Sequence, residues 1–528
     1  MANPSLQIGN SNWAIKEDNL LGYSTAGTRF VPQPITMTRA SAGTRVNSSG
    51  LVETVELLGS EDVTNGDFTQ LPLGTGWDAY TSGSSTVAFT EGAILSIDGS
   101  NSNVGVYQQN IFTNGVQYKI IVSVKATASF DAEIVESQGA ATQTTIGTVS
   151  LTTSYQDFVF YFTGTGTNDL FIHRLYGETA GQNQQIYIKE VSVKESTKNN
   201  LARVDYDGTA SSLLVEPERT NLITESSDFT TWTTTGSAEV TPNTTISPDG
   251  TQNADTLNIF SGNFFYKPIT SGAGTFTLSC YVKVASGTLD FKMQSFNGTD
   301  GADASSTFTA NTNWQRFEFT TTVTTDSNFY PIQVSGLTGG DFQIWGAQLE
   351  VGSYATSYIP TDGGTVTRVQ DQYSKAGISN LINSEEGVLF IEMAALSDDE
   401  TKREITLSDG THLNYVLIRF NSGGSNIIYT RVDVDAGGGL QYWDLDNSHT
   451  ITNTNKIAIR WGASNFATFI NGVKVGSQLS GSSFSADTLN ELNFDNGTGG
   501  SNFFGKVKQL QVFKTALTDT ELETLTTI

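Results

Sequence analysis

The chain has little cysteine and little positive charge, and both shortages narrow what it can be. Cys280 is the only cysteine in 528 residues, so an intrachain disulfide and a cysteine-based metal site are excluded. It stands in the alternating run Thr277–Val284, where we expect a small core residue. Lysine and arginine number 28 against 54 acidic residues, giving a net charge of −26. Such a surface repels phosphate backbones and anionic lipids, so we expect no nucleic-acid and no membrane partner.

Long apolar segments are also missing. No stretch approaches the roughly 18 apolar residues of a membrane-spanning helix. The start of the chain, Met1 to Asn10, has neither the basic nor the apolar region of a secretion signal. We therefore expect synthesis in a cytoplasm with no secretion signal.

The residues that are abundant belong to β-structure. Charged residues are only 16% of the chain and glycine accounts for 52 residues, while Thr, Ser and Asn separate aromatic and β-branched residues. This composition predicts an all-β protein.

One arginine-containing element is interrupted by a long insertion. Its halves, 38–55 and 201–223, which we call the frame, carry Arg39, Arg45, Arg203 and Arg219 among short apolar runs. The residues between them alternate with period two, as in a sandwich domain. We predict an N-terminal frame and attachment segment at 1–60, completed by 197–222, with a jelly-roll domain inserted at 61–196.

The pattern of the insertion returns later in the chain. Lys125 has a counterpart in Lys283, and Tyr155-Gln156 has one in Trp314-Gln315. Because landmarks recur in one order at similar spacing, we predict a second jelly-roll domain at 223–371.

The last domain is predicted at 385–528, where short alternating runs again indicate a sandwich. Asn471-Gly472 between two such runs predicts a tight hairpin turn. Thr518 and Glu521 form a capping-box pattern with Leu517 and Leu522 as its staple, so a short terminal helix should follow.

The two copies resemble jelly-roll carbohydrate-binding modules in their N/S-x-D-F start, late aromatic-Gln-x-Phe strand and closing strand. The resemblance implies aromatic rings that stack on sugars, for which Trp345 in the second closing strand is a candidate. It also implies an optional calcium ion, the only cofactor we expect, held by oxygen ligands. The candidates are Asn65, Asp67 and Glu190 in the first copy, and Asp228 and Glu350 in the second. Alternatively, Asp67 and Asp228 accept hydrogen bonds from turn amides.

Two longer resemblances suggest a biological setting. The stretch 349–371, together with the frame, resembles a recurring framework of virion proteins of tailed bacteriophages. The pattern F-x-N-G-x-x-V-G and the closing strand and helix at 385–528 resemble concanavalin A-like, laminin-G-type domains. They imply a fibre or capsid decoration on the virion exterior, made in the host cytoplasm, which contacts other virion proteins through the N-terminal frame. Such appendages are commonly trimeric, so we predict a homotrimer.

Catalytic patterns are incomplete. Glucanases of the concanavalin A-like fold carry E-x-D-x-E on one strand, whereas this chain has Arg431, Asp433 and Asp435. His173, His412 and His449 are isolated and lack metal-site spacing. We predict a non-enzymatic glycan-binding protein. The alternative is a phage-tail polysaccharide depolymerase, a glycoside hydrolase or lyase, with unrecognised catalytic carboxylates.

The strongest glycan-binding candidates are Tyr442, Trp443 and Asp444, beside a run of three glycines. Adjacent residues on a strand face opposite sides, so one of the two rings must point outward. The outward ring could stack on a sugar or cover a protein contact.

Overall fold

The computed structural model describes the chain except for residues 1, 11–12, 17–18, 27–28, 91, 101, 138–142, 176, 178, 298–304 and 447. Nearly all regular structure is β, which confirms the predicted class. The contacts divide the chain into two compact units. The insert is Glu56–Thr197, and the larger unit combines Met1–Val55 with Lys198–Ile528. The predicted insertion at 61–196 lies inside the first of these.

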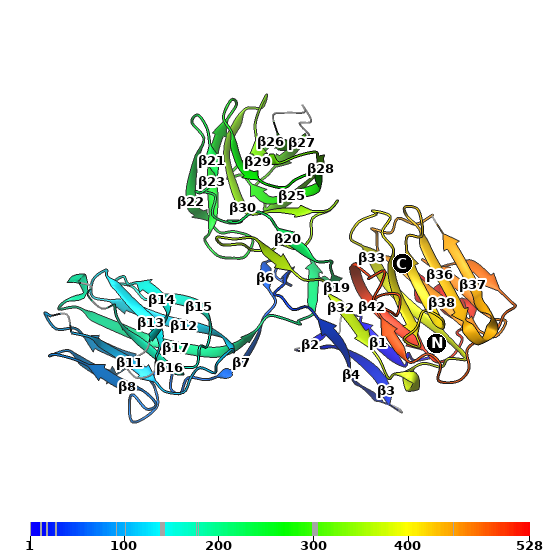
Figure 1. Cartoon of the computed structure of the whole chain (residues 1–528), viewed down its shortest axis with the longest axis horizontal. Coiled ribbons are helices and arrows are strands. Elements are labelled where there is room, and N and C mark those ends of the chain that lie inside the picture. Colours follow the sequence, from blue (N-terminus) through cyan, green and yellow to red (C-terminus); the bar gives the residue numbers. More distant parts are fainter. Residues whose placement is uncertain are drawn as a thin grey trace. The chain divides into compact units, whose positions relative to one another are not determined.

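The insert is a sandwich of two antiparallel sheets (Figure 1). One sheet has the order β15-β12-β17-β10-β9, with β7 paired to β17; the other has the order β14-β13-β16-β11-β8. The bounds are β7 (Leu57–Glu61), β8 (Asp78–Thr81), β9 (Thr86–Thr90), β10 (Gly92–Ser96), β11 (Val104–Gln108), β12 (Gln117–Ala126), β13 (Asp131–Ser137), β14 (Gln143–Ser150), β15 (Gln156–Thr163), β16 (Asp169–Arg174), the 3-10 turn η1 (Thr179–Gly181) and β17 (Gln185–Thr197).

Alternation explains which face of these strands is buried. In β12, Ile120, Val122 and Val124 enter the core between the sheets, while Lys119 and Lys125 lie on the opposite face. The same pattern in β17 buries Ile186 to Val193 at alternate positions around one bulge. One face of the β15-β12-β17 sheet is therefore available outside the sandwich core.

The second jelly roll lies in the larger unit and repeats this plan. Its sheets have the orders β21-β24-β29-β26-β27 and β22-β23-β30-β25-β28. The bounds are β20 (Arg219–Asn221), β21 (Thr233–Thr234), β22 (Glu239–Thr245), β23 (Ala254–Phe260), β24 (Phe265–Ile269), β25 (Gly274–Lys283), β26 (Leu289–Phe296), β27 (Ser305–Ala310), β28 (Gln315–Val323), β29 (Ser327–Gln333), β30 (Gly339–Val351) and β31 (Val366–Arg368), where β20 pairs with β31.

The two copies match strand for strand. In both, the central strand pairs with the aromatic-Gln strand on one side and the closing strand on the other: β12 with β15 and β17, and β25 with β28 and β30. The register between the central and closing strands shifts in both copies, between Ser123 and Val124 in the first and between Ser279 and Tyr281 in the second. Cys280 is buried in the second core, as predicted, and burial raises the pKa of its thiol to about 12.

The C-terminal domain and the N-terminal strands share one hydrogen-bonded system. One series runs β41-β34-β35-β36-β37 and another runs β42-β33-β38-β39-β40. They enclose the largest core cluster. The bounds are β32 (Gln372–Lys375), η2 (Ser379–Leu381), β33 (Glu386–Ala395), β34 (Arg403–Ser408), β35 (Tyr415–Phe420), β36 (Ile428–Val434), η3 (Asp435–Gly437), β37 (Gly439–Asp446), β38 (Asn455–Gly462), β39 (Phe466–Ile470), β40 (Val473–Gln478), β41 (Glu491–Asn493) and β42 (Gly505–Phe513).

The N-terminal segment packs with the C-terminal domain, so the boundary predicted between 1–60, 197–222 and 385–528 does not separate two cores. Strand β1 pairs with β42, so does β19, and β4 pairs with β32. Leu6, Ile8, Ile35 and Leu213 belong to the core of the C-terminal domain, because these short strands cannot bury their apolar faces alone. The bounds are β1 (Leu6–Gly9), β2 (Ala14–Lys16), β3 (Asn19–Ala26), β4 (Arg29–Thr38), β5 (Thr44–Val46), β6 (Val52–Thr54), β18 (Arg203–Asp207) and β19 (Ala210–Val215).

Two local predictions in the C-terminal domain are confirmed. Asn471 and Gly472 have φ values of 51° and 84° and connect β39 to β40. Helix α1 (Asp519–Thr526) begins after Thr518, whose side chain accepts from the Glu521 amide while the Glu521 side chain accepts from the Thr518 amide. Among the described residues this eight-residue helix is the only α-helix, and no helix could cross a bilayer.

Candidate functional site

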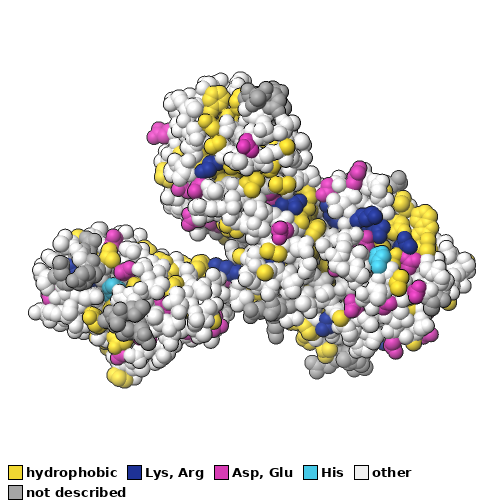
Figure 2. Space-filling view, viewed as in Figure 1, with side chains coloured by type: hydrophobic (Ala, Val, Ile, Leu, Met, Phe, Trp, Pro, Cys, Tyr) yellow, Lys and Arg dark blue, Asp and Glu magenta, His cyan; other side chains and the backbone are white. Residues whose placement is uncertain are grey.

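Trp443 projects from β37 on the outside of the C-terminal domain. It is 56% exposed, whereas Tyr442 before it is buried, so the prediction that one ring faces outward is confirmed. The Trp443 ring lies 6.4 Å from the ring of Tyr429 on the neighbouring strand β36. Leu445, next but one along β37, is also exposed. Figure 2 shows hydrophobic side chains gathered beside Lys and Arg side chains on this domain.

Polar and aromatic side chains of β36 and β35 lie beside Trp443. Arg431 is directly opposite Trp443, and its Nε atom donates to Asp433 Oδ2 at 2.5 Å. Arg419 lies over the Tyr429 ring at 4.9 Å and Arg431 over the Tyr415 ring at 5.9 Å. Burial raises the pKa of Tyr415, and its hydrogen bond with Asp433 raises it further, so this hydroxyl stays protonated. We call Tyr415, Tyr429, Arg431, Asp433 and Trp443 the aromatic surface.

Tyr442 and Asp444 were predicted to bind glycans together with Trp443, but neither lies on the same face of β37 as Trp443. Tyr442 is part of the core: its ring stacks on Phe466 at 5.8 Å and its hydroxyl donates to Thr468 Oγ1 at 3.0 Å. It therefore cannot contact a ligand, which corrects its assignment. Asp444 is half-buried, and burial raises the pKa of its carboxyl. Alternation places it on the opposite side of β37 from Trp443.

Trp345 is also not a ligand-binding residue. It is buried in a small cluster with Val52, Ala254 and Tyr358, and its ring lies 4.6 Å from that of Tyr358. Its position on the outer face of β30 is as expected for a binding aromatic. The residues after β30 and the hairpin β5–β6 cover it, which strand periodicity does not reveal.

The calcium candidates are largely occupied by hydrogen bonds. Asp67 accepts a hydrogen bond from the Thr69 amide at 3.2 Å, and Asp228 accepts one from the Thr230 amide at 2.9 Å. These bonds agree with the alternative interpretation, in which both carboxylates bind turn amides. Asn65 accepts from the Gln70 amide and donates to the Thr75 carbonyl. Glu350 is buried and accepts from the Thr356 amide at 2.5 Å. Glu190 is exposed. No group of three or more His, Cys, Asp or Glu residues suited to a metal occurs in the part of the chain described, and calcium binding stays a prediction.

Two arginines of the frame, Arg39 and Arg203, form a buried ionic cluster with Arg368. Arg39 Nη1 lies 2.6 Å from Asp371 Oδ1, Arg203 Nη1 lies 2.5 Å from Glu216 Oε2, and Arg368 Nη1 lies 3.1 Å from the same oxygen. Arg203 also bonds Asp371. Burial opposes ionisation of Glu216, but Arg368 and Arg203 hold its pKa well below the usual range. The cluster joins the two halves of the frame and is closed to ligands.

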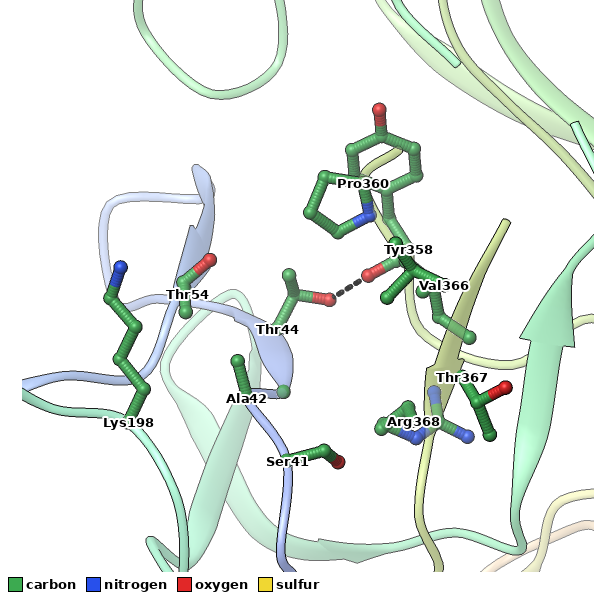
Figure 3. A pocket seen from close by; sticks show the side chains of 12 residues that line it. Ser41, Ala42, Thr44, Thr54, Lys198, Tyr358, Pro360, Val366, Thr367 and Arg368 are labelled. Carbon is green, nitrogen blue, oxygen red and sulfur yellow. Dashed lines mark hydrogen bonds between the residues drawn. The ribbon is translucent and has the colours of Figure 1, made fainter. Parts of the chain in front are cut away.

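A pocket of about 230 Å³ opens beside this cluster (Figure 3). Its wall includes Ala42, Pro360 and Val366, and the Thr44 hydroxyl donates to the Tyr358 carbonyl at its side. Ligand pockets are usually about 300–1,000 Å³. This pocket is smaller, and Arg368 in its wall is already paired with Glu216.

The histidines show no catalytic arrangement. His173 is buried against Phe171, and burial lowers the pKa of its imidazole. His412 stacks on Tyr415 at 4.8 Å, at the margin of the aromatic surface. His449 lies 3.8 Å from Asp446. Sequence reasoning missed Tyr415 and Tyr429, although Tyr429, Arg431 and Asp433 alternate visibly along one strand.

Among known proteins, similarity to this chain is found only with solved structures. No protein-family model and no curated protein matches the chain. The Ruminococcus gnavus IT-sialidase CBM40 bound to α2,3 sialyllactose is 17% identical over 27% of this chain and 83% of its own, with a TM-score of 0.24. The CBM22-1-CBM22-2 tandem of Paenibacillus barcinonensis Xyn10C is 11% identical over 56% and 98%, with a TM-score of 0.22. Values this low assign no ligand to this chain.

Proposed function

We propose that the protein is a non-enzymatic exterior component of a phage particle, a fibre or capsid decoration, that binds host or environmental glycans through its β-sandwich domains. The observation that carries the glycan-binding part is the exposed Trp443 ring, held beside Tyr429 and Arg431. The phage setting rests on the sequence resemblance of the frame and of 349–371.

The aromatic surface has the chemistry that a pyranose requires. An exposed indole offers an apolar face to the C–H side of a sugar ring. Arg431 supplies N–H donors, so hydroxyl groups at the edge of that ring could be bound. Asp433 is only 5% exposed and is paired with Arg431. That pairing supports a binding role over catalysis.

The test is adsorption of the full-length protein to host cells and to a glycan array. We expect Trp443→Ala to reduce binding about two- to tenfold while changing the melting temperature little, because stacking on an aromatic ring contributes about 0.5–1.5 kcal/mol and the side chain is more than half exposed. Val473→Ala, at another exposed apolar position of this domain, is the matched control. Unchanged adsorption of Trp443→Ala would remove the site.

Incubation of the full-length protein with polysaccharides distinguishes binding from catalysis. We expect no release of reducing ends from capsular or algal polysaccharides. Release that disappears in Asp433→Ala would support the depolymerase alternative instead.

We also propose a homotrimer that contacts other virion proteins through its N-terminal frame. Light scattering at micromolar concentration should then give three times the chain mass of 56.7 kDa. A single chain mass would contradict this assembly.

A further inference from the structure

The outer face of the β15-β12-β17 sheet in the insert carries aromatic and lysine side chains together. Tyr155, Val159 and Tyr161 at the β15 edge are each more than 40% exposed, at 42%, 51% and 44%. Across from them on β12 stand Lys125, Ile121 and Lys119. We call this surface the insert face.

One end of the insert face is a lysine between two tyrosine rings. The Lys125 amine lies 4.7 Å from the centre of the Tyr155 ring and 5.3 Å from that of Tyr187. Lys189 lies 6.0 Å from the Tyr155 ring. The Tyr187 hydroxyl donates to Gln185 Oε1 at 2.6 Å, which holds its ring in place.

These two lysines have no carboxylate partner within ion-pair distance among the described residues. The other lysines of the face do: Lys119 pairs with Glu56 at 3.0 Å and Lys194 with Glu61 at 4.0 Å. Uncompensated positive charge is therefore concentrated at the Lys125 and Lys189 end.

This concentration is unusual for so acidic a chain. The insert holds five basic residues, and all except Arg174 lie on this one face: Lys119, Lys125, Lys189 and Lys194. Asp157 and Glu190 stand opposite Ser123 in the middle of the face. A ligand must therefore be anionic at the lysine end and carry neutral hydrogen-bond donors in the middle.

The equivalent face of the second jelly roll is closed by the chain itself. Lys283 lies 4.8 Å from the Trp314 ring, which reproduces the Lys125 and Tyr155 pair. Residues 353–361 cover the rest of that face, because Gln348 accepts from the Ile359 amide at 2.6 Å and Arg316 donates to the Thr356 carbonyl at 2.6 Å.

The insert has different residues at the positions that hold this cover. The strand registers align Arg316 with Asp157, Gln348 with Ser192, and Glu350 with Lys194. Trp345, buried under the cover, directly follows Ile344, as the exposed Lys189 directly follows Ile188, and these two isoleucines are opposite the matching residues Val282 and Val124. The insert face thus lacks the groups that hold a covering segment and has lysines instead.

We propose that the insert face binds a linear acidic glycan that alternates anionic and neutral sugars. Lys125 and Lys189 bind one carboxylate or sulfate group, while Tyr155 and Tyr187 pack against the sugar that carries it. The neutral neighbour donates its hydroxyls to Asp157 and Glu190. The inference rests on the proposed function for the glycan class, but it names a second site, in the other unit.

The dimensions of the face suit a short oligosaccharide. Lys119 and Lys125 are six residues apart on β12, which corresponds to about 20 Å at roughly 3.3 Å per residue. That length accommodates several consecutive sugars along the strands.

The test is binding of the full-length protein to hyaluronan, which has one carboxylate in each disaccharide, by calorimetry at low and moderate salt. Carboxyl-reduced hyaluronan is the neutral probe, and carboxyl-reduced chondroitin sulfate, whose only anionic groups are sulfates, distinguishes sulfate from carboxylate recognition. We expect binding to at least one acidic polymer, weakened by salt and at least tenfold weaker for the neutral polymer.

Two variants and one matched control complete the experiment. Lys125→Gln with Lys189→Gln should reduce acidic-polymer binding at least tenfold, and Tyr155→Ala should reduce it severalfold. Lys283→Gln, the equivalent position on the covered face, should leave it unchanged. Equal binding of the neutral polymer, unaffected binding in the double variant, or no acidic-polymer binding at all would overturn the proposal. Trp443→Ala should keep this binding, so failure here and failure of the proposed function are distinguishable.

Discussion

The two jelly rolls share one strand plan and one lysine-aromatic pair, but they use the same sheet face in opposite ways. In the second copy the face is covered by residues 353–361 and by the hairpin β5–β6, and Trp345 is buried beneath them. In the insert the face carries exposed Tyr155 and Tyr161. The comparison of the two copies therefore shows which side chains go with a covered sheet face and which go with an exposed face that a partner can reach.

Besides Gln348 and Arg316 of the sandwich, a polar group from outside the sandwich holds the cover. Ser357, in the covering segment, donates its amide and its hydroxyl to Glu216 at 2.7 Å each, and Glu216 is itself paired with Arg203 and Arg368. The frame thus supplies the anchor for the cover. The insert has no counterpart of this anchor among its described residues.

The largest expected effect comes from removing that anchor. Glu216→Ala leaves Arg203 and Arg368 short of a counter-charge in a buried site, so we expect a loss of about 3–5 kcal/mol in the free energy of unfolding of the larger unit. Denaturant unfolding followed by tryptophan fluorescence would measure it. The matched change on the insert face, Glu190→Ala, should alter stability by less than about 0.5 kcal/mol. Similar losses of unfolding free energy in Glu216→Ala and Glu190→Ala would contradict the distinction between covered and open faces.

A second pair of variants compares aligned positions directly. Trp345→Ala removes a buried ring and should cost about 3–5 kcal/mol, whereas Lys189→Ala at the equivalent exposed position should be nearly neutral. Hydrogen exchange of β25 and β12 in the two variants would report each sandwich separately. A destabilised insert in Lys189→Ala would show that its face is covered.

Acid should weaken the anchor of the cover. Burial favours the neutral form of Glu216 and Asp371, but the neighbouring arginines lower both pKa values below their ordinary ones. A carboxyl with a lowered folded pKa contributes stability above its unfolded pKa of about 4 and loses it as pH falls through the folded value. We expect stability of the larger unit to decrease from about pH 5 downward, by up to about 1.4 kcal/mol per pH unit for each group. Glu216→Gln should flatten this slope, and an unchanged slope would contradict the assignment.

The smallest effect should follow removal of the whole insert. Joining Val55 to Lys198 deletes one compact unit and leaves the other intact. Because loop closure depends weakly on length, the larger unit should keep its melting temperature within a few degrees, as measured by circular dichroism. Loss of its cooperative transition would show that the insert is required for folding.

Local patterns predicted local structure well. Period-two alternation identified the strands of the insert and the outward ring at Trp443, and the Asn471-Gly472 and Thr518–Glu521 patterns identified a hairpin and a helix start. The turn interpretation of Asp67 and Asp228 also depends only on near neighbours. Each of these features arises from interactions between residues close in sequence.

The errors concern contacts between distant segments. Trp345 alternates like a binding aromatic, but residues 353–361 and β5–β6 bury it. The N-terminal strands looked like a separate frame, but β1 completes the core of the C-terminal domain beside β42. The insert face was missed because its lysines and tyrosines come from three strands.

By itself, the sequence determined the all-β class, the duplicated sandwich, the turns and the cap, since period, propensity and turn chemistry are properties of short segments. Only the tertiary structure decided which sheet faces are covered, which of the candidate aromatics are exposed, and that Arg39, Arg203 and Arg368 share two buried carboxylates. The physical reason is that burial and charge pairing depend on which distant segments meet, and a strand has the same alternation whether its outer face meets solvent or another part of the chain.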